Sequence, residues 1–210
     1  MKRQKWNNGK AVLIFAKAPE KGKVKTRLAR DVDGDFAVST YRKIVEKTVE
    51  TVLLTPFPPV ICFSPAEKER MMKDWLGRHL SYMAQKGDNL GQRMACAFRS
   101  AFDNGCSQVL LIGSDIPGIE PGHLSEAFSL LNENDAVIGP AYDGGYWLIG
   151  FNRNSFSPHV FADIPWSTKD VLARTMEQFA GPGLTVGFSA KLRDLDTGDD
   201  LSLLQGDIRR

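Results

Sequence analysis

Two patterns of apolar residues alternate along this chain. Short continuous apolar runs are typical of strands that are buried on both faces of a sheet. Longer segments, in which apolar residues recur every three or four positions, are typical of helices with one buried face. The continuous runs predict strands at residues 11–16 (AVLIFA), 60–63, 80–84, 109–112, 136–138 and 184–188, with a further apolar segment at 146–149.

The periodic segments predict helices, and local residues mark where several of them begin or end. Proline suits the first turn of a helix, and an Asn-Gly pair stops one. Ser167 and Thr168 are candidate N-caps, with Asp170 favourably placed in the first turn. The predicted helices span about residues 36–54, 65–76, 90–102, 121–132 and 168–179.

The alternation of strands and helices defines the expected fold class. It predicts an α/β protein with a mostly parallel sheet, covered by helices on both faces, to which the later strands can add an antiparallel pair. A length of 210 residues suits one domain over 1–210, in which residues 1–10 form a flexible tail. No apolar stretch approaches the roughly 20 residues of a membrane span, and we expect a cytoplasmic protein.

Charge and cysteine content narrow the function classes. The formal net charge is +2, which does not suggest binding to nucleic acid or to an anionic membrane. The three cysteines show no CxxC spacing, which favours reduced thiols over a disulfide framework or a zinc site. These are Cys62, Cys96 and Cys106. The histidines, His79, His123 and His159, are isolated in the sequence, and we expect them at the surface or in loops.

A basic loop, Lys17–Arg27, follows the first predicted strand. Ligands of open α/β sheets bind at the carboxyl ends of the strands. Gly22 lets backbone amides approach an anion, and the Lys and Arg side chains supply positive charge. The loop is not a P-loop, because Val24 follows Lys23 where that pattern needs Ser or Thr. The segment predicts phosphate binding, with a solvated basic loop as the alternative.

A single acid, Asp115, follows the buried run 109–112. A charge at this place is costly unless it is paired or coordinates a cation. Mg²⁺ takes one or two carboxylates together with waters and phosphate oxygens. Because the basic loop should lie along the same sheet edge, Asp115 is a candidate ligand for a metal that bridges a diphosphate. The alternative is an Asp that caps a turn before Pro117.

Two further motifs follow in the second half of the chain. Around Asp143, two glycines allow a tight turn and the close approach of a ligand. Tyr142, Tyr146 and Trp147 are candidates for the wall of an acceptor site, with core aromatics beside a β-turn as the alternative. In the second motif, Asp196 is a candidate metal ligand, and a helix start capped by the following Thr is an alternative that can coexist with it.

Five motifs occur in one order and together carry a family resemblance. The chain resembles the bacterial GT-A-type glycosyltransferase family of uncharacterised proteins (DUF2064), which is sometimes linked to arsenosugar biosynthesis. It is similar, more distantly, to phospholactate guanylyltransferases and molybdenum-cofactor nucleotidyltransferases. The motifs span nearly the whole chain: FAKAPEKGKVKTRL (15–28), IGSDIPG (112–118), GPAYDGGYWLIG (139–150), WST (166–168) and LRDLDTGDDL (192–201).

The resemblance implies a fold and a set of site residues. The fold is the nucleotide-diphospho-sugar transferase (GT-A, Rossmann-like) fold, a three-layer α/β/α sandwich. A Mg²⁺ or Mn²⁺ ion would bind Asp115, with Asp196 as a further ligand, although the DxD motif of many sugar transferases is replaced by Gly-Ser-Asp. The residues of the turn itself, rather than the resemblance, make Gly144, Gly145 and Tyr146 candidate acceptor contacts. The residues implied for nucleotide and phosphates are Ala16, Lys17, Gly22, Lys25 and Arg27.

The function expected first is glycosyl transfer from a nucleotide-diphosphate sugar to a small-molecule acceptor. The metal and the basic loop, with Lys25 in it, would stabilise charge on the leaving diphosphate. Asp143 would orient or deprotonate the acceptor hydroxyl. The alternatives are nucleotidyl transfer from an NTP to a phosphate or carboxylate acceptor, and a nucleotide-binding protein without turnover. The oligomeric state is left open, a homo-oligomer included.

Overall fold

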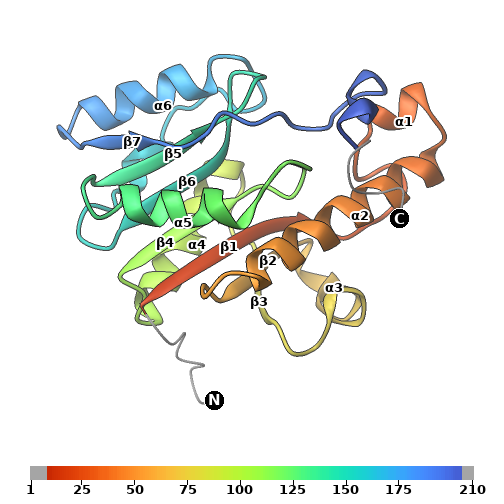
Figure 1. Cartoon of the computed structure of the whole chain (residues 1–210), viewed down its shortest axis with the longest axis horizontal. Coiled ribbons are helices and arrows are strands. Elements are labelled where there is room, and N and C mark those ends of the chain that lie inside the picture. Colours follow the sequence, from red (N-terminus) through yellow and green to blue (C-terminus); the bar gives the residue numbers. More distant parts are fainter. Residues whose placement is uncertain (1–8, 205–210) are drawn as a thin grey trace.

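The computed structural model describes residues 9–204, so most of the predicted tail (1–10) lies outside the described residues. The described strands form one seven-stranded sheet in the order β3-β2-β1-β4-β6-β5-β7 (Figure 1). Their bounds are β1 (Lys10–Lys17), β2 (Pro59–Ser64), β3 (Ser81–Ala84), β4 (Gln108–Ile112), β5 (Ala136–Pro140), β6 (Tyr146–Asn152) and β7 (Val186–Phe188).

The chain reverses its direction of travel across the sheet at β1. Strands β2 and β3 add in turn to one side of β1, and β4 returns to its other side; all four run parallel. Strand β6 runs antiparallel to β4 and β5, and β7 pairs parallel with β5. The expected mostly parallel sheet with a later antiparallel pair is confirmed. The reversal between β1 and β4 is a topological switch point, where open α/β sheets bind ligands.

Helices cover both faces of the sheet, which gives the expected three layers. Buried side chains of α2, α3 and α5 join one core, and those of α4 and α6 join the other (Figure 1). Strand β1 contributes to both, since Val12 and Ile14 enter the first core while Ala11 and Leu13 enter the second. The α-helices are α1 (Leu28–Asp31), α2 (Gly34–Leu53), α3 (Glu69–Leu76), α4 (Leu90–Asp103), α5 (Pro121–Leu130) and α6 (Val171–Ala180).

Three helix starts differ from the sequence pattern. After Pro65 the chain first forms a 3-10 turn at Ala66–Lys68, and α3 begins at Glu69. Helix α2 begins two residues before the predicted position, because the Asp33 carboxylate accepts hydrogen bonds from Asp35 N (2.7 Å) and Phe36 N (3.2 Å). The predicted cap of α6 by Ser167 and Thr168 is wrong. The Thr168 hydroxyl donates to Pro165 O (2.8 Å) within a turn, and the helix begins at Val171.

One of the histidines, His123, has a local structural role. His123 lies in the first turn of α5, and its Nδ1 accepts a hydrogen bond from Glu120 N at 3.1 Å. The Glu120 side chain in turn accepts from the helix backbone, so the two residues form a capping box. The imidazole therefore fixes the start of a helix, and its ring packs edge-on against Trp147.

The three cysteines are free, as predicted, and two of them are buried. Burial raises the pKa of the Cys62 thiol and raises that of Cys106 to about 11. These two thiols are therefore protonated and poorly nucleophilic at neutral pH. Within residues 9–204, no helix is both long enough and apolar enough to cross a membrane.

Candidate functional site

The basic loop leaves the carboxyl end of β1 and turns its last lysine, Lys25, inward. Only 5% of the Lys25 side chain is exposed, and its backbone is held at a φ of 45°. The Lys25 Nζ lies 3.2 Å from Asp196 Oδ1 and 3.8 Å from Asp115 Oδ2, and it also donates to Leu195 O. A buried ammonium is tolerated when carboxylates and a carbonyl surround it in this way. Lys25 therefore joins the loop after β1 to both acids that the sequence singled out.

A hydrogen-bond pair fixes the strand end from which this loop departs. The Lys17 amide donates to the Tyr41 hydroxyl oxygen (2.7 Å), and that hydroxyl donates to Lys17 O (3.1 Å). Burial raises the pKa of Tyr41 to about 12, so the phenol stays protonated and keeps its donor role. The Lys17 side chain itself is exposed.

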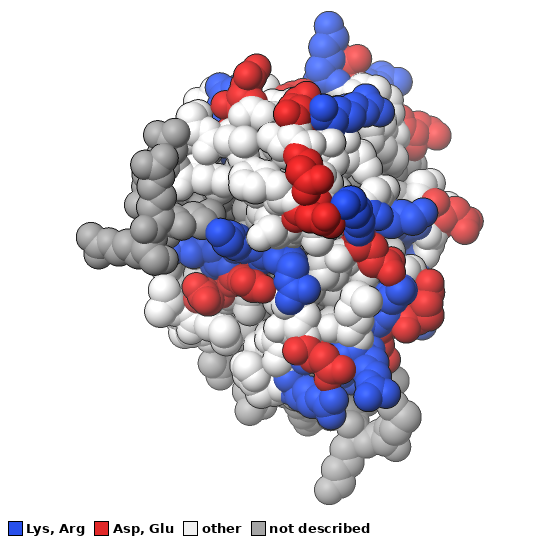
Figure 2. Space-filling view, turned by 90° about the vertical axis from the view of Figure 1, so that its right-hand side faces the viewer, with Lys and Arg blue, Asp and Glu red and all other residues white. Residues whose placement is uncertain are grey.

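The larger of two cavities at this sheet edge has a volume of about 790 Å³ and contains the basic loop. Figure 2 shows the face of the molecule at the carboxyl ends of the parallel strands, where Lys and Arg side chains are interspersed with Asp and Glu. Gly22, at a φ of 76°, lies on the loop but outside the residues that line the cavity. The basic side chains in the lining are Lys17, Lys23, Lys25, Arg27, Arg93 and Lys169.

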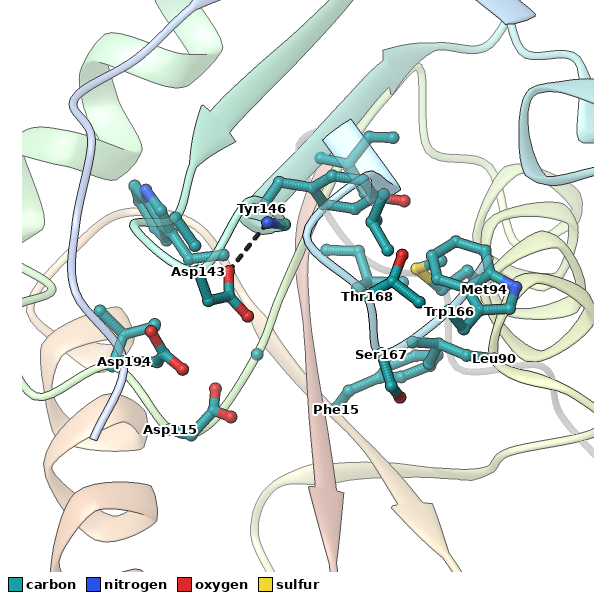
Figure 3. Close-up of a pocket in the computed structure, with 18 residues that line it drawn as sticks. Phe15, Leu90, Met94, Asp115, Asp143, Tyr146, Trp166, Ser167, Thr168 and Asp194 are labelled. Carbon is teal, nitrogen blue, oxygen red and sulfur yellow. Dashed lines mark hydrogen bonds between the residues drawn. The ribbon is translucent and has the colours of Figure 1, made fainter. Parts of the chain in front are cut away.

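The smaller cavity, of about 300 Å³, adjoins the first. Asp115 and Asp143 line both cavities, so these two carboxylates stand where the cavities meet. Figure 3 shows Asp115, Asp143 and Asp194 on one side of the smaller cavity, facing a mostly apolar wall. That wall includes Phe15, Leu90, Met94, Tyr146 and Trp166.

The turn at residues 143–145 holds one of the shared carboxylates in place. Gly145 N donates to Asp143 Oδ1 at 2.8 Å. Gly144 adopts a φ of 91°, and a side chain there would run into the backbone of Lys169. Gly144 is therefore required by the turn itself, and the turn aims Asp143 at the junction of the cavities.

The three aromatic side chains proposed as an acceptor wall have different positions. Tyr146 lines the smaller cavity, and burial raises its pKa well above the usual value for a tyrosine. Trp147 also borders that cavity but is only 2% exposed, and its indole N–H donates to Ala190 O at 2.9 Å. Tyr142 is exposed and lies under the cationic groups of Lys191 and Arg193, outside the lining of both cavities.

Sequence reasoning gave no role to two residues of the site, Trp166 and Asp194. Asp194 is half-buried, and its pKa is raised to about 6 by burial and by the nearby charges of Asp143, Asp196 and Asp115. Asp194 and Asp196 flank the fully buried Leu195. Leu195 N donates to Asp115 O at 3.0 Å, which ties this segment to the loop after β4.

The carboxylates fit a hard divalent metal by donor type, but not as a ready-made cage. Mg²⁺ and Mn²⁺ prefer carboxylate and phosphate oxygens. Among residues 9–204, however, no three or more His, Cys, Asp or Glu side chains come close enough to hold a metal ion together. Asp115 and Asp196 are bound to the Lys25 ammonium instead. A metal here would take one or two carboxylates and complete its shell with substrate oxygens and water, and the predicted metal site stays a prediction.

Comparisons with known proteins show which family and which fold this chain belongs to. The model of one family, described as "Uncharacterized protein conserved in bacteria (DUF2064)", matches residues 48–168. A crystal structure from Desulfovibrio desulfuricans G20, provisionally named a nucleotide-diphospho-sugar transferase, is 39% identical with a TM-score of 0.91, covering 96% of this chain and 88% of that one. No curated protein matches. The expected nucleotide-diphospho-sugar transferase fold is confirmed.

Two more distant structures share the fold at low identity. One is CMP:2-keto-3-deoxy-manno-octonic acid synthetase complexed with CTP, which is 10% identical with a TM-score of 0.59, covering 93% of this chain and 96% of that one. The other is a Mycobacterium tuberculosis H37Rv protein in complex with manganese, which is 15% identical with a TM-score of 0.56 and the same two coverages, 93% and 96%. At these identities the likeness establishes the arrangement of helices and strands.

Proposed function

We propose that this chain transfers a glycosyl group. The premise is that the chain belongs to the bacterial family described as uncharacterized (DUF2064) and is a transferase. The donor is a nucleotide-diphosphate sugar, the acceptor is a small molecule, and a divalent metal assists. One observation carries the proposal: a cavity with basic side chains and a cavity with an apolar wall meet at two carboxylates, Asp115 and Asp143.

The donor's diphosphate belongs in the larger cavity. Lys25 is buried there, and the exposed Arg27 guanidinium, 3.5 Å from Asp196, can swing onto a phosphate. When bound, Mg²⁺ or Mn²⁺ neutralises diphosphate charge, and Asp115 is the residue best placed to hold it, with Asp196 as a second ligand. The manganese and CTP complexes of the distant structures support a nucleotide and a metal in this fold.

The transfer requires one bond to break and one to form at the sugar's anomeric carbon. The bond from this carbon to the diphosphate oxygen breaks, and a bond to the acceptor oxygen forms. The acceptor's hydroxyl proton passes to the Asp143 carboxylate, which stands between the cavities. Lys25 stabilises the negative charge that develops on the departing nucleoside diphosphate.

Nucleotidyl transfer is the second candidate, because the CTP-bound synthetase has the same fold. In that reaction an acceptor phosphate or carboxylate would attack the α-phosphate of an NTP and release pyrophosphate. The larger cavity would serve both reactions, since each depends on the positioning and stabilisation of phosphate charge. The two candidates differ in the leaving group and in the charge of the acceptor.

Ligand-induced thermal stabilisation separates the candidates. The full chain is screened with nucleotide-sugars and NTPs, each with Mg²⁺, Mn²⁺ or a chelator; a ligand at about 100 times its dissociation constant adds about 2.7 kcal/mol of stability. Preference for a nucleotide-sugar, followed by nucleoside diphosphate release on addition of acceptors, is the expected result. Preference for an NTP with pyrophosphate release would establish the second candidate. Saturable binding without turnover across a broad acceptor panel would contradict both.

A further inference from the structure

The smaller cavity differs from the larger one in the sign of its charges. Three carboxylates line it, those of Asp115, Asp143 and Asp194. None of the described residues in its lining is a Lys, Arg or His. Figure 3 shows these three carboxylates grouped on one side of the cavity, so their negative charges repel one another. A second anion brought into this cavity would meet the same repulsion.

The rest of the lining is apolar and rigidly supported. The rings of Tyr146 and Trp166 meet edge to face at 6.5 Å between centroids. Trp166 packs directly on the first turn of α4, where Gly91 leaves room; a Cβ at Gly91 would lie 2.9 Å from the indole. Figure 3 shows Trp166 beside Met94 and Leu90, opposite the carboxylates. A flat or branched apolar group can fill this side of the cavity while a polar group faces the acids.

Charge therefore divides the site into a half for anions and a half that rejects them. The basic side chains Lys17, Lys23 and Arg27 all line the larger cavity and none lines the smaller. A phosphate or carboxylate on the donor finds cations in its own half. An acceptor with such a group would find carboxylates and no basic partner in the other half.

We propose that the acceptor is an alcohol with an apolar, preferentially aromatic body and no phosphate or carboxylate group. The assignment rests on the proposed function and specifies its second substrate. The apolar body lies against Trp166 and Met94, and the hydroxyl points to Asp143, which takes its proton as the oxygen bonds to the sugar carbon. A protonated amine in place of the hydroxyl is also attracted by the carboxylates, so charge discriminates against anions alone.

Three small probes with the same ring test this charge preference. They are 2-phenylethanol, 2-phenylethylamine and 3-phenylpropionate, added to the full chain with Mg²⁺ and the nucleoside diphosphate that stabilises it most, and their dissociation constants are measured by ligand-observed NMR. The alcohol and the amine are expected to bind at least tenfold more tightly than the carboxylate. Equal or tighter binding of 3-phenylpropionate overturns the assignment, as does the absence of binding by all three probes at 10 mM.

Two variants locate the binding. Trp166→Ala should weaken binding of 2-phenylethanol at least tenfold. It should leave the dissociation constant of the nucleoside diphosphate unchanged, since Trp166 does not line the larger cavity. Thr168→Lys places a cation on an exposed residue of the rim and should bring 3-phenylpropionate binding to within threefold of the alcohol. Unchanged probe affinities in either folded variant would place the probes elsewhere and overturn the assignment.

Failure of this assignment is distinguishable from failure of the proposed function. A protein that binds no nucleotide-sugar, or that releases pyrophosphate from an NTP, contradicts glycosyl transfer whatever the probes show. A protein that binds a nucleotide-sugar and glycosylates a phosphorylated or carboxylated acceptor retains the proposed function and overturns only the acceptor class.

Discussion

The larger and the smaller cavity share Asp115 and Asp143, but they are built in different ways. Most basic residues of the larger cavity come from one loop, residues 17–27, which follows β1 directly. The smaller cavity is assembled from β1, α4, β4 and the loop after it, the turn at 141–145, β6, and the segments at 166–171 and 194. Substitutions in the loop should therefore change ligand binding with little effect on folding. Substitutions around the smaller cavity should affect both.

The two cavities also differ in how their charged side chains interact before a ligand binds. In the larger cavity the Lys25 ammonium is held by carboxylates, so an incoming diphosphate and metal must rearrange existing ion pairs. In the smaller cavity Asp115 is paired with Lys25 of the larger cavity, but Asp143 and Asp194 have no basic partner in the lining, and burial and the neighbouring carboxylates raise the pKa of Asp194. Before any ligand binds, the charges of the larger cavity therefore stabilise the folded protein, whereas the carboxylates of the smaller cavity destabilise it.

The largest effect is expected for Lys25→Met, which removes the buried ammonium and keeps the length of the side chain. Turnover should fall by about 100- to 1,000-fold, because the departing diphosphate loses a preorganised cation. Steady-state kinetics with the best nucleotide-sugar measures the loss. Lys21→Met is the matched control, since Lys21 lies on the same loop but pairs with Asp35 at 2.8 Å, outside the cavity lining. Equal losses in both variants would mean that burial of Lys25 has no functional meaning.

Asp143→Asn should lower turnover by about 100-fold while the dissociation constant of the donor changes less than twofold. The amide oxygen can still accept from Gly145 N, so the turn is kept and the proton acceptor is lost. Donor binding by calorimetry and single-turnover rates measure the two quantities separately. A variant with normal turnover would remove Asp143 from the mechanism.

Gly144→Ala tests how far the smaller cavity depends on its turn. The substitution should lower the free energy of unfolding by about 2 kcal/mol, because alanine is strained at this φ and its Cβ meets the Lys169 backbone. Urea denaturation measures the change. Gly122→Ala, in the first turn of α5 with open space around it, should be neutral or slightly stabilising. Equal stability of the two variants would contradict the described turn.

Much of the fold and of the larger cavity was predictable because the relevant signals are local. Continuous apolar runs separated by periodic segments were enough to predict the sheet type, and the loop at 17–27 concentrates its lysines within one stretch of sequence. The smaller cavity was less predictable. Trp166 and Asp194 reach it through tertiary contacts, such as the bond from Leu195 N to Asp115 O, which leave no spacing signal in the sequence.

The errors have an equally local cause. Ser, Thr and Asp side chains hydrogen-bond to whichever backbone groups lie nearest, so the same residue types mark caps and turns. At Thr168 the hydroxyl reaches back to Pro165 O, and the helix begins later than the pattern predicts. At His123 the imidazole accepts from Glu120 N, three residues earlier, and so caps the helix. These choices depend on competing partners only a few residues away.

Asp115→Asn tests the proposed metal site. The described residues supply oxygen donors there but no group of three or more side chains that could hold a metal ion by themselves. The variant should fold normally and lose the part of nucleotide binding that depends on Mg²⁺ or Mn²⁺, about tenfold in affinity or about 1.4 kcal/mol. Thermal shifts with metal and with chelator measure that part directly. If the difference between metal and chelator is unchanged, Asp115 does not bind a metal.

The smallest effect is expected for Asp194→Asn, and its sign depends on pH. The pKa of Asp194 rises from 3.8 to about 6 on folding, so the charged form is penalised in the folded state. This penalty is absent below pH 3.8, grows as the pH rises from 3.8 to about 6 and is complete above pH 6. The variant, which carries no charge, should therefore gain about 1 kcal/mol of stability at pH 7.5, a figure already reduced for solvent screening of a half-buried group.

Urea denaturation in the presence of a chelator, at pH 7.5 and at pH 4, measures both ends of this dependence. The gain of Asp194→Asn should be present at pH 7.5 and largely lost at pH 4. Glu67→Gln removes an exposed carboxylate outside both cavities and should show no such dependence. A gain of equal size at both pH values would attribute the effect to something other than charge repulsion. A loss of stability at pH 7.5 would mean that the carboxylates around the smaller cavity do not repel one another in the folded protein.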